Sequence, residues 1–234
     1  MTIYFKHIKA VALATAVAFA GTASAETTNT VKLLSANFET RDVVKIEVGD
    51  FHFVPGQDAP IHTHAAPAIG YVAKGSIIYQ IEGEKPQILR TGDAFYEPVG
   101  PRIVQFDNAS ATEEAIFLDF NLQQEGEPFI VFEKPLTENI DRRTLPTIEP
   151  GEVTIDSADI FTTDLANGGK FELKNEAPTF GLVAEGVVDL LIEGQSPQHI
   201  AAGASFSVPA NALKATFVNA SSEVPAKVIT FVIR

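Results

Sequence analysis

The sequence predicts an all-β fold built as two tandem barrels of about 100 residues each. Two observations lead to this expectation: an internal repeat, and short runs rich in β-branched and aromatic residues that alternate with turn signals. Typical runs are "GSIIYQIEG" and "EEAIFLDFNL", which are bounded by Glu-Gly, Thr-Gly-Asp and Pro-x-Gly turns. Apart from a weak pattern in 135–143, no segment repeats its apolar residues with the period of a helix.

The repeat becomes visible when the chain is shifted by 111 residues, which aligns Ala66–Phe120 with Ala177–Phe231. Of the 55 aligned positions 20 are identical, and the alignment contains no gap. The sequence "NAS" occurs at the same place in both halves, at Asn108 and Asn219, so we interpret it as a turn between strands rather than as a glycosylation acceptor. Duplication of one all-β unit therefore predicts two similar barrels, whose pairing would cover exposed strand edges.

The first 25 residues have the organisation of a cleaved signal peptide. Lys6 and Lys9 form a charged start, "AVALATAVAFA" is an apolar run too short to span a bilayer, and Ala23–Ala25 is an Ala-x-Ala cleavage site. We therefore expect a mature chain that begins at Glu26 and is periplasmic or secreted. No other segment is apolar enough for membrane insertion.

The mature chain divides into three parts. Residues 26–137 are expected to form the N-terminal barrel, 138–150 a proline-containing linker, and 151–234 the C-terminal barrel. The chain has no cysteine, so its stability must come from an apolar core. The formal charge of −13 makes nucleic acid an unlikely partner, because an acidic surface repels phosphate. A monomer and a homodimer are both compatible with the sequence.

A His-Thr-His segment in the first repeat is the main candidate site. Alternate side chains of a strand leave by the same face, so His62 and His64 should point together to the side opposite Thr63. Neutral imidazoles suit divalent transition metals such as Fe, Mn, Ni, Zn or Cu. Two ligands rarely suffice, however, so a retained metal would need further ligands from the barrel wall.

The glycines, prolines and histidines of the first repeat resemble the two sequence motifs of the cupin superfamily. Gly56 is followed after five residues by the His62–His64 pair, and Gly75 closes the first motif. The second motif reads Gly92, five residues, then "PVG", with Asn108 further on. The resemblance covers nearly the whole mature chain. It implies a bicupin, in which each half is a jelly-roll (double-stranded β-helix) barrel.

The metal-ligand positions of the cupin motifs are only partly kept. The resemblance implies three histidines and one glutamate, but Ala68 and Ile103 occupy two of these four positions. In the second repeat all four differ, so we expect a degenerate barrel without a metal; the residues there are Leu173, Asn175, Thr179 and Lys214. Asn175 and Lys214 remain candidates for a second pocket. A lysine inside a barrel would need a carboxylate or anion partner, and it could instead turn out to solvent.

Four other residues complete the predicted site of the first barrel. Glu97 could supply a carboxylate to a metal, and some cupins that resemble this chain carry "EPPG" at that point. Gln105 lies two residues after Ile103 and should therefore share its face of the strand. Tyr79, Ile103 and Gln105 are expected to line a ligand pocket together with the two histidines.

Three functions remain open at this level. The first is an exported bicupin that binds a small organic ligand in the N-terminal barrel, with at most a weak divalent-metal site. The second, implied by the resemblance, is a metal-dependent enzyme acting on a small acid, phenolic or sugar as a dioxygenase, isomerase, decarboxylase or lyase. The third is a structural role. The substrate and the identity of any metal are not determined by the sequence.

Overall fold

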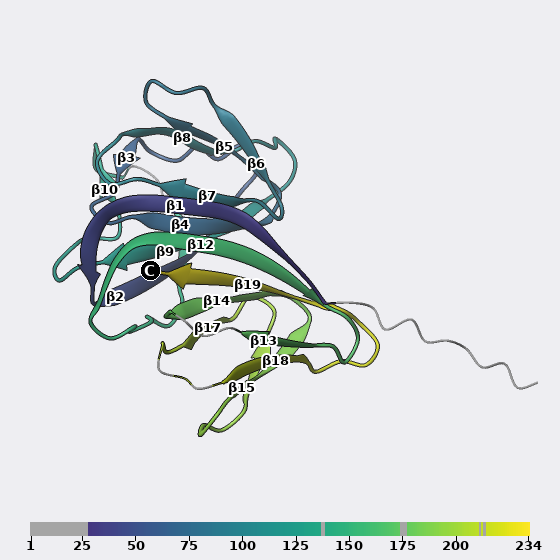
Figure 1. The fold of residues 1–234 in the computed structure, drawn as a ribbon. Coiled ribbons are helices and arrows are strands. Elements are labelled where there is room, and N and C mark those ends of the chain that lie inside the picture. Colours follow the sequence, from purple (N-terminus) through teal and green to yellow (C-terminus); the bar gives the residue numbers. More distant parts are fainter. Residues whose placement is uncertain (1–27, 137–138, 174–176, 211, 213) are drawn as a thin grey trace, which may run out of the picture.

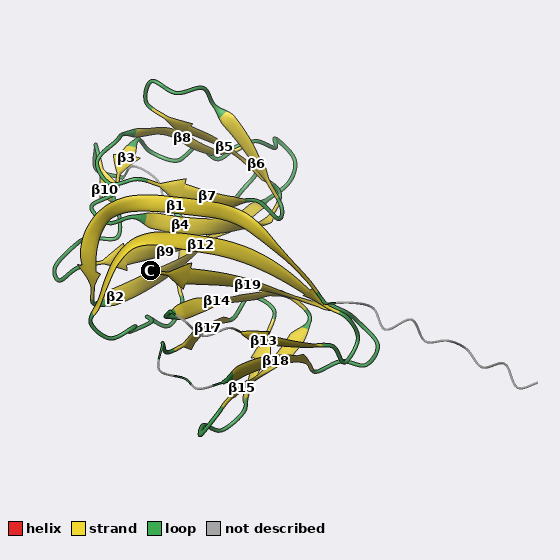
Figure 2. Cartoon of the chain, in the orientation of Figure 1, coloured by secondary structure: helices red, strands yellow, loops and turns green. Residues whose placement is uncertain are grey.

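The computed structural model describes residues 28–136, 139–173, 177–210, 212 and 214–234. Within these ranges the chain consists of strands and loops, as Figure 2 shows. The described ranges therefore contain no helix of the length and apolarity that a membrane span requires. The predicted signal peptide and the expected mature start at Glu26 lie outside the described residues. The prediction of an all-β chain is confirmed.

Two five-stranded antiparallel sheets enclose the first barrel (Figure 1). One sheet has the order β11 (Asp141–Thr144), β2 (Lys45–Phe53), β9 (Ala115–Gln123), β4 (Ala68–Lys74), β7 (Ala94–Glu97). The other has the order β10 (Val131–Phe132), β3 (His62–Thr63), β8 (Ile103–Asn108), β5 (Ser76–Ile81), β6 (Gln87–Arg90).

The second barrel repeats this arrangement. Its larger sheet has the order β1 (Asn29–Val43), β12 (Val153–Leu165), β19 (Ala226–Ile233), β14 (Thr179–Glu185), β17 (Ser205–Val208). Its smaller sheet has the order β13 (Lys170–Leu173), β18 (Ala215–Asn219), β15 (Val187–Ile192), β16 (Gln198–Ala201). The tandem two-barrel architecture expected from the repeat is thus confirmed.

The leading strand of each repeat pairs with the barrel of the other repeat. Strand β1 precedes the first barrel in the chain but pairs with β12, and β11 precedes the second barrel but pairs with β2. The two pairings have the same register: Thr30 faces Thr163, and a shift of 111 residues relates this pair to Asp141 and His52, which also face each other. Figure 1 shows β1 and β12 as long neighbouring ribbons. Strand β11 lies inside the segment 138–150 that was expected to be a linker, so strands cross the predicted domain boundaries.

Three apolar cores result from this arrangement. One fills each barrel, and a third lies between the two larger sheets and draws residues from both repeats. At its centre the ring of Phe120 lies 5.4 Å from that of Phe180 and 4.6 Å from that of Phe231, measured between centroids. All three rings are fully buried, so the two barrels are joined by a core rather than by a solvated surface.

The paired Asn-Ala-Ser sequences have a structural role in both barrels. Asn108 is buried, and its Nδ2 donates to the carbonyls of Phe53, Val54 and Glu113. Asn219 forms the three equivalent bonds in the second barrel. These amides satisfy carbonyls that would otherwise be buried without partners. The interpretation of both sequences as structural turns is confirmed.

Candidate metal centre

His62 and His64 point into the first barrel from the short strand β3 and the residue that follows it. Their exposed fractions are 4% and 2%, whereas Thr63 between them is half-buried. The two ring centroids are 5.3 Å apart. Strand β3 is held between β8, where Ile103 faces His62, and β10, where Phe132 faces the same residue. The inward direction expected from strand alternation is therefore confirmed.

Glu97 completes the group from the opposite sheet. It is the last residue of β7, and its direct neighbour across the strands is Ala68 of β4. The methyl group of Ala68 leaves room above it, and the Glu97 carboxylate approaches both histidines. Its Oε1 lies 3.4 Å from His62 Nε2 and its Oε2 lies 3.4 Å from His64 Nε2. One atom from each of the three residues lies within 4.8 Å of the others, which is close enough to hold one metal ion.

The outer nitrogens of the two imidazoles have their own partners. Nδ1 of His62 donates to the Pro60 carbonyl at 2.8 Å. Nδ1 of His64 lies 3.3 Å from Asn121 Nδ2, while His64 Nε2 is buried and has no hydrogen-bond partner. Ligating histidines in metal sites are oriented in this way, with one nitrogen held by the protein and the other free for the ion. The donor set and the unsatisfied Nε2 therefore fit a metal ion.

The electrostatics of the group centre on Glu97. Burial by itself would raise the pKa of this carboxyl, but the charge of His64 and the hydrogen bonds with His62 and His64 lower it to about 2. Burial likewise opposes protonation of His64, yet the Glu97 carboxylate raises the His64 pKa above its usual value. A carboxylate and an imidazolium thus stabilise each other when no ion is bound.

Asp119 is a fourth polar side chain at this centre. It is buried on β9, and its Oδ1 has no hydrogen-bond partner. Burial and the nearby Glu97 charge raise its pKa to about 8, against the opposing attraction of His64 and Arg142. Asp119 therefore carries a proton at neutral pH, because two unscreened carboxylates cannot both be ionised in the same apolar space.

The centre opens onto a small apolar chamber. Its volume is about 30 Å³, which corresponds to roughly one water molecule. The polar residues on its wall are His62, His64, Glu97 and Asp119, and the remainder is mainly phenylalanine and isoleucine. An ion and a small co-ligand fit this volume, whereas an organic molecule does not.

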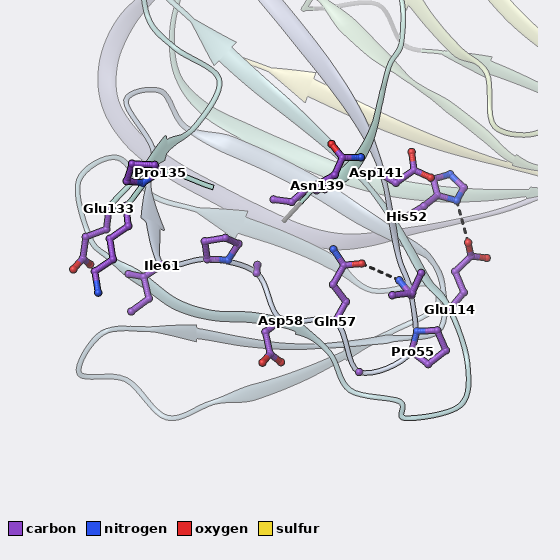
Figure 3. Close-up of a pocket in the computed structure, with 16 residues that line it drawn as sticks. His52, Pro55, Gln57, Asp58, Ile61, Glu114, Glu133, Pro135, Asn139 and Asp141 are labelled. Atoms are coloured by element: carbon purple, nitrogen blue, oxygen red, sulfur yellow. Dashed lines mark hydrogen bonds and ion pairs between the residues drawn. The ribbon is translucent and has the colours of Figure 1, made fainter. Parts of the chain in front are cut away.

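A larger groove lies beside the chamber (Figure 3). It has a volume of about 820 Å³ and is bounded mainly by 54–61, 133–135 and 139–141. Figure 3 shows Asp58 and Gln57 along one rim and Asn139 along the other. Ala59 and Ile140 line both the groove and the chamber, so these two side chains separate the spaces. The volume is typical of small-molecule sites.

The structure does not bring Gln105 to the metal centre, contrary to expectation. Gln80 faces Gln105 but Ile81 faces Ile103, so Val104 is an extra residue in β8. Such a bulge reverses the alternation of side chains, and Phe106 rather than Gln105 shares the inner face with Ile103. Gln105 Nε2 instead donates to Asp107 Oδ2 at 3.2 Å. A period-two argument cannot detect a bulge, which explains the error.

The remaining predicted pocket residues lie elsewhere. Tyr79 and Ile103 are buried in the core of the first barrel, and the Tyr79 hydroxyl donates to the Tyr96 carbonyl at 2.7 Å. In the second barrel Lys214 is not inside a pocket, since 57% of its side chain is exposed and its Nζ lies 2.6 Å from Glu172 Oε1. Asn175 lies outside the described residues.

The sequence did contain a signal for Asp119 and Asn121, which the prediction omitted. In "IFLDFNLQ" the apolar residues Leu118, Phe120 and Leu122 alternate with polar ones, so the polar residues from Asp119 onward share one face. That face is the barrel interior, where unpaired polar groups are costly. Charged and amide side chains at such positions point to a site.

Comparison with known proteins agrees with this architecture. Residues 49–121 match the family model described as a cupin domain. AerE from Microcystis aeruginosa superposes with a TM-score of 0.58 at 16% identity, over 87% of this chain and 98% of that chain. Salicylate 1,2-dioxygenase from Pseudaminobacter salicylatoxidans gives 0.53 at 13% identity, over 81% and 71%.

Vicilin from Capsicum annuum is similar to the same extent, with a TM-score of 0.58 at 13% identity, over 82% of this chain and 76% of that chain. At these identities the three structures show a shared fold and nothing finer. The search of curated protein sequences found no match. The predicted relationship to the cupins is confirmed.

Replacement of Asp119 by Asn should change how stability depends on pH in the metal-free protein. The folded-state pKa of about 8 lies above the usual 3.8, so the folded chain keeps a proton that the unfolded chain releases between these values. Wild-type stability should therefore fall as pH rises through this window. Because asparagine cannot ionise, the stability of Asp119→Asn relative to wild type should rise by more than about 1 kcal/mol from pH 5 to pH 8.

Urea unfolding with a chelator present measures this difference. The matched control is Asp156→Asn, because Asp156 is an exposed residue of β12. A difference between Asp119→Asn and wild type that stays constant from pH 5 to pH 8 would contradict the assignment of a protonated Asp119.

Proposed function

We propose that this chain, a tandem member of the cupin superfamily, binds one divalent transition-metal ion in its N-terminal barrel through His62, His64 and Glu97. The observation that carries the proposal is the convergence of their three ligand atoms to within 4.8 Å in a buried place. Two imidazoles and one carboxylate suit Fe, Mn, Ni, Zn or Cu, and the choice among these metals is left to measurement.

The buried polar atoms support a cation at this position. His64 Nε2 and Asp119 Oδ1 are both buried without hydrogen-bond partners. A divalent ion would satisfy His64 Nε2 and offset the negative charge that Glu97 and Asp119 place in an apolar space. Binding would also release protons from the site, as is general for ligands that must be deprotonated.

We propose in addition that a small organic ligand binds in the groove rather than inside the barrel. The chamber of about 30 Å³ excludes such a molecule, while the groove of about 820 Å³ accommodates one and adjoins the centre at Ala59 and Ile140. Thermal-shift assays with small carboxylic acids, phenols and sugars test this. A compound that stabilises wild type should lose its effect in Ala59→Trp but not in the exposed-site control Ala109→Trp, and equal shifts in both variants would contradict the groove.

Catalysis is the second candidate function, and the adjacency of groove and centre favours it. A bound divalent metal supplies Lewis acidity or oxygen chemistry of the kinds found among cupin enzymes. The residues of this chain would hold a ligand in the groove, and Phe51, Phe117 and Phe132 would limit the entry of bulk water to the chamber. Asp119 could hold a proton beside the centre.

Export of the protein is a proposal that rests on the N-terminal sequence alone. The charged start, the apolar run and Ala23–Ala25 support cleavage after residue 25. N-terminal sequencing of the protein recovered from the periplasm or culture medium of a bacterial host should give Glu26 as the first residue. Recovery of uncleaved chain from the cytoplasm would contradict it.

Metal binding should be stoichiometric and should depend on the two histidines. Mature protein without an affinity tag, stripped with a chelator and titrated with Co²⁺, should bind one ion and develop visible absorption. Each of His62→Ala and His64→Ala should weaken the affinity more than about 100-fold, since even residues behind the ligands contribute 10- to 100-fold.

The matched control is His199→Ala, because His199 is exposed and paired with Asp189. It should bind Co²⁺ as wild type does. Absence of binding by wild type, or equal binding by His62→Ala, would refute the proposed centre.

A further inference from the structure

Strand β11 brings one cationic side chain of the second repeat into the first barrel. Arg142 faces Phe51 of β2, on the inner side of the sheet. Its Nη2 donates to Glu47 Oε1, two strand positions beyond Gly49 on the same face. The side chain of Arg142 therefore runs along the inside of β2 instead of pointing to solvent.

The guanidinium of Arg142 lies over the ring of Phe129. Its Cζ is 3.7 Å from the ring centroid, a cation–π contact at close range. Gly49 makes this contact possible, because a Cβ at that position would approach Arg142 Nε to 3.0 Å and Phe129 Cζ to 3.1 Å. The absence of a side chain at residue 49 thus provides the space in which these two groups meet.

The backbone of Phe129 is in turn connected to the metal centre. Its carbonyl accepts a hydrogen bond from Asn121 Nδ2 at 3.0 Å, and the same Nδ2 lies 3.3 Å from His64 Nδ1. The carbonyl is also a hydrogen-bond partner of the His64 ring itself. Any displacement of Phe129 would consequently move the groups that determine how the His64 ring is turned.

The second barrel does not contain this arrangement. A shift of 111 residues places Val31 at the position of Arg142, and Val31 is 46% exposed. The same shift places Ile160 at the position of Gly49 and Ala158 at that of Glu47. The arginine, the glycine and the glutamate therefore occur together only in the barrel that holds the histidine pair, within the part of the chain that the structure describes.

We propose that Arg142 is a positioning residue of the metal centre: the second repeat supplies this guanidinium, which fixes Phe129 so that His64 Nε2 stays directed at Glu97. The second repeat then contributes to metal binding although its own ligand positions are lost. The inference rests on the proposed metal site, and its test separates the two.

The first measurement is Co²⁺ affinity in three variants. Arg142→Met should weaken binding about 10- to 100-fold, the range found for groups that orient ligands. Arg142→Lys should also bind more weakly than wild type, because an ammonium can keep the ion pair with Glu47 but lacks the planar guanidinium. The control Arg143→Met alters the adjacent exposed arginine of the same strand and should leave the affinity unchanged.

The second measurement uses metal-free protein, so that it does not depend on metal binding. Two-dimensional ¹H–¹⁵N spectra of the imidazole nitrogens should show that Arg142→Met and Arg142→Lys change the His64 resonances. The His62 resonances should stay as in wild type, because the Pro60 carbonyl holds that ring independently.

The outcomes distinguish the inference from the proposed function. Unchanged His64 resonances, or wild-type Co²⁺ affinity in Arg142→Lys, would overturn the positioning role. Equal changes at His62 and His64 would indicate general loosening of the barrel and would also overturn it. If wild type bound no Co²⁺, the metal-binding proposal would fail, and the spectra alone would still decide whether Arg142 orients His64.

Discussion

The first barrel depends on one arrangement, a buried carboxylate held between two buried imidazoles. An ionised carboxylate in an apolar interior is costly unless nearby groups compensate its charge. His62 and His64 provide that compensation for Glu97, with contacts of 3.4 Å from each ring. The neighbouring features follow from it: Asp119 keeps its proton, and the outer nitrogens of both rings have partners of their own.

The duplication has preserved the scaffold in both halves and the chemistry in only one. Asn108 and Asn219 close equivalent turns, and the exchanged strands have the same register. The second half lacks the histidine pair, yet it contributes strand β11 and half of the core around Phe120. The two barrels are therefore one folding unit in physical terms, and loss of ligands in one half need not mean loss of a role.

The chamber and the groove divide two tasks that many binding sites combine. A volume of about 30 Å³ with phenylalanine walls keeps bulk water away from Glu97 and strengthens its electrostatic interactions. The groove of about 820 Å³ has the size and the mixed lining suited to a small molecule. The thin boundary at Ala59 and Ile140 is where events in one space can affect the other.

The sequence by itself determined the all-β class, the duplication, the inward direction of His62 and His64, and the absence of the cupin ligand set from the second repeat. These features depend on local alternation and on repeated spacing, which a single chain displays directly. The tertiary structure decided that Glu97 joins the histidines, that a bulge at Val104 turns Gln105 away, and that Arg142 crosses into the first barrel. These depend on cross-strand neighbours, on an irregular ladder and on strand exchange between repeats, and such non-local pairings leave no periodic trace in the sequence.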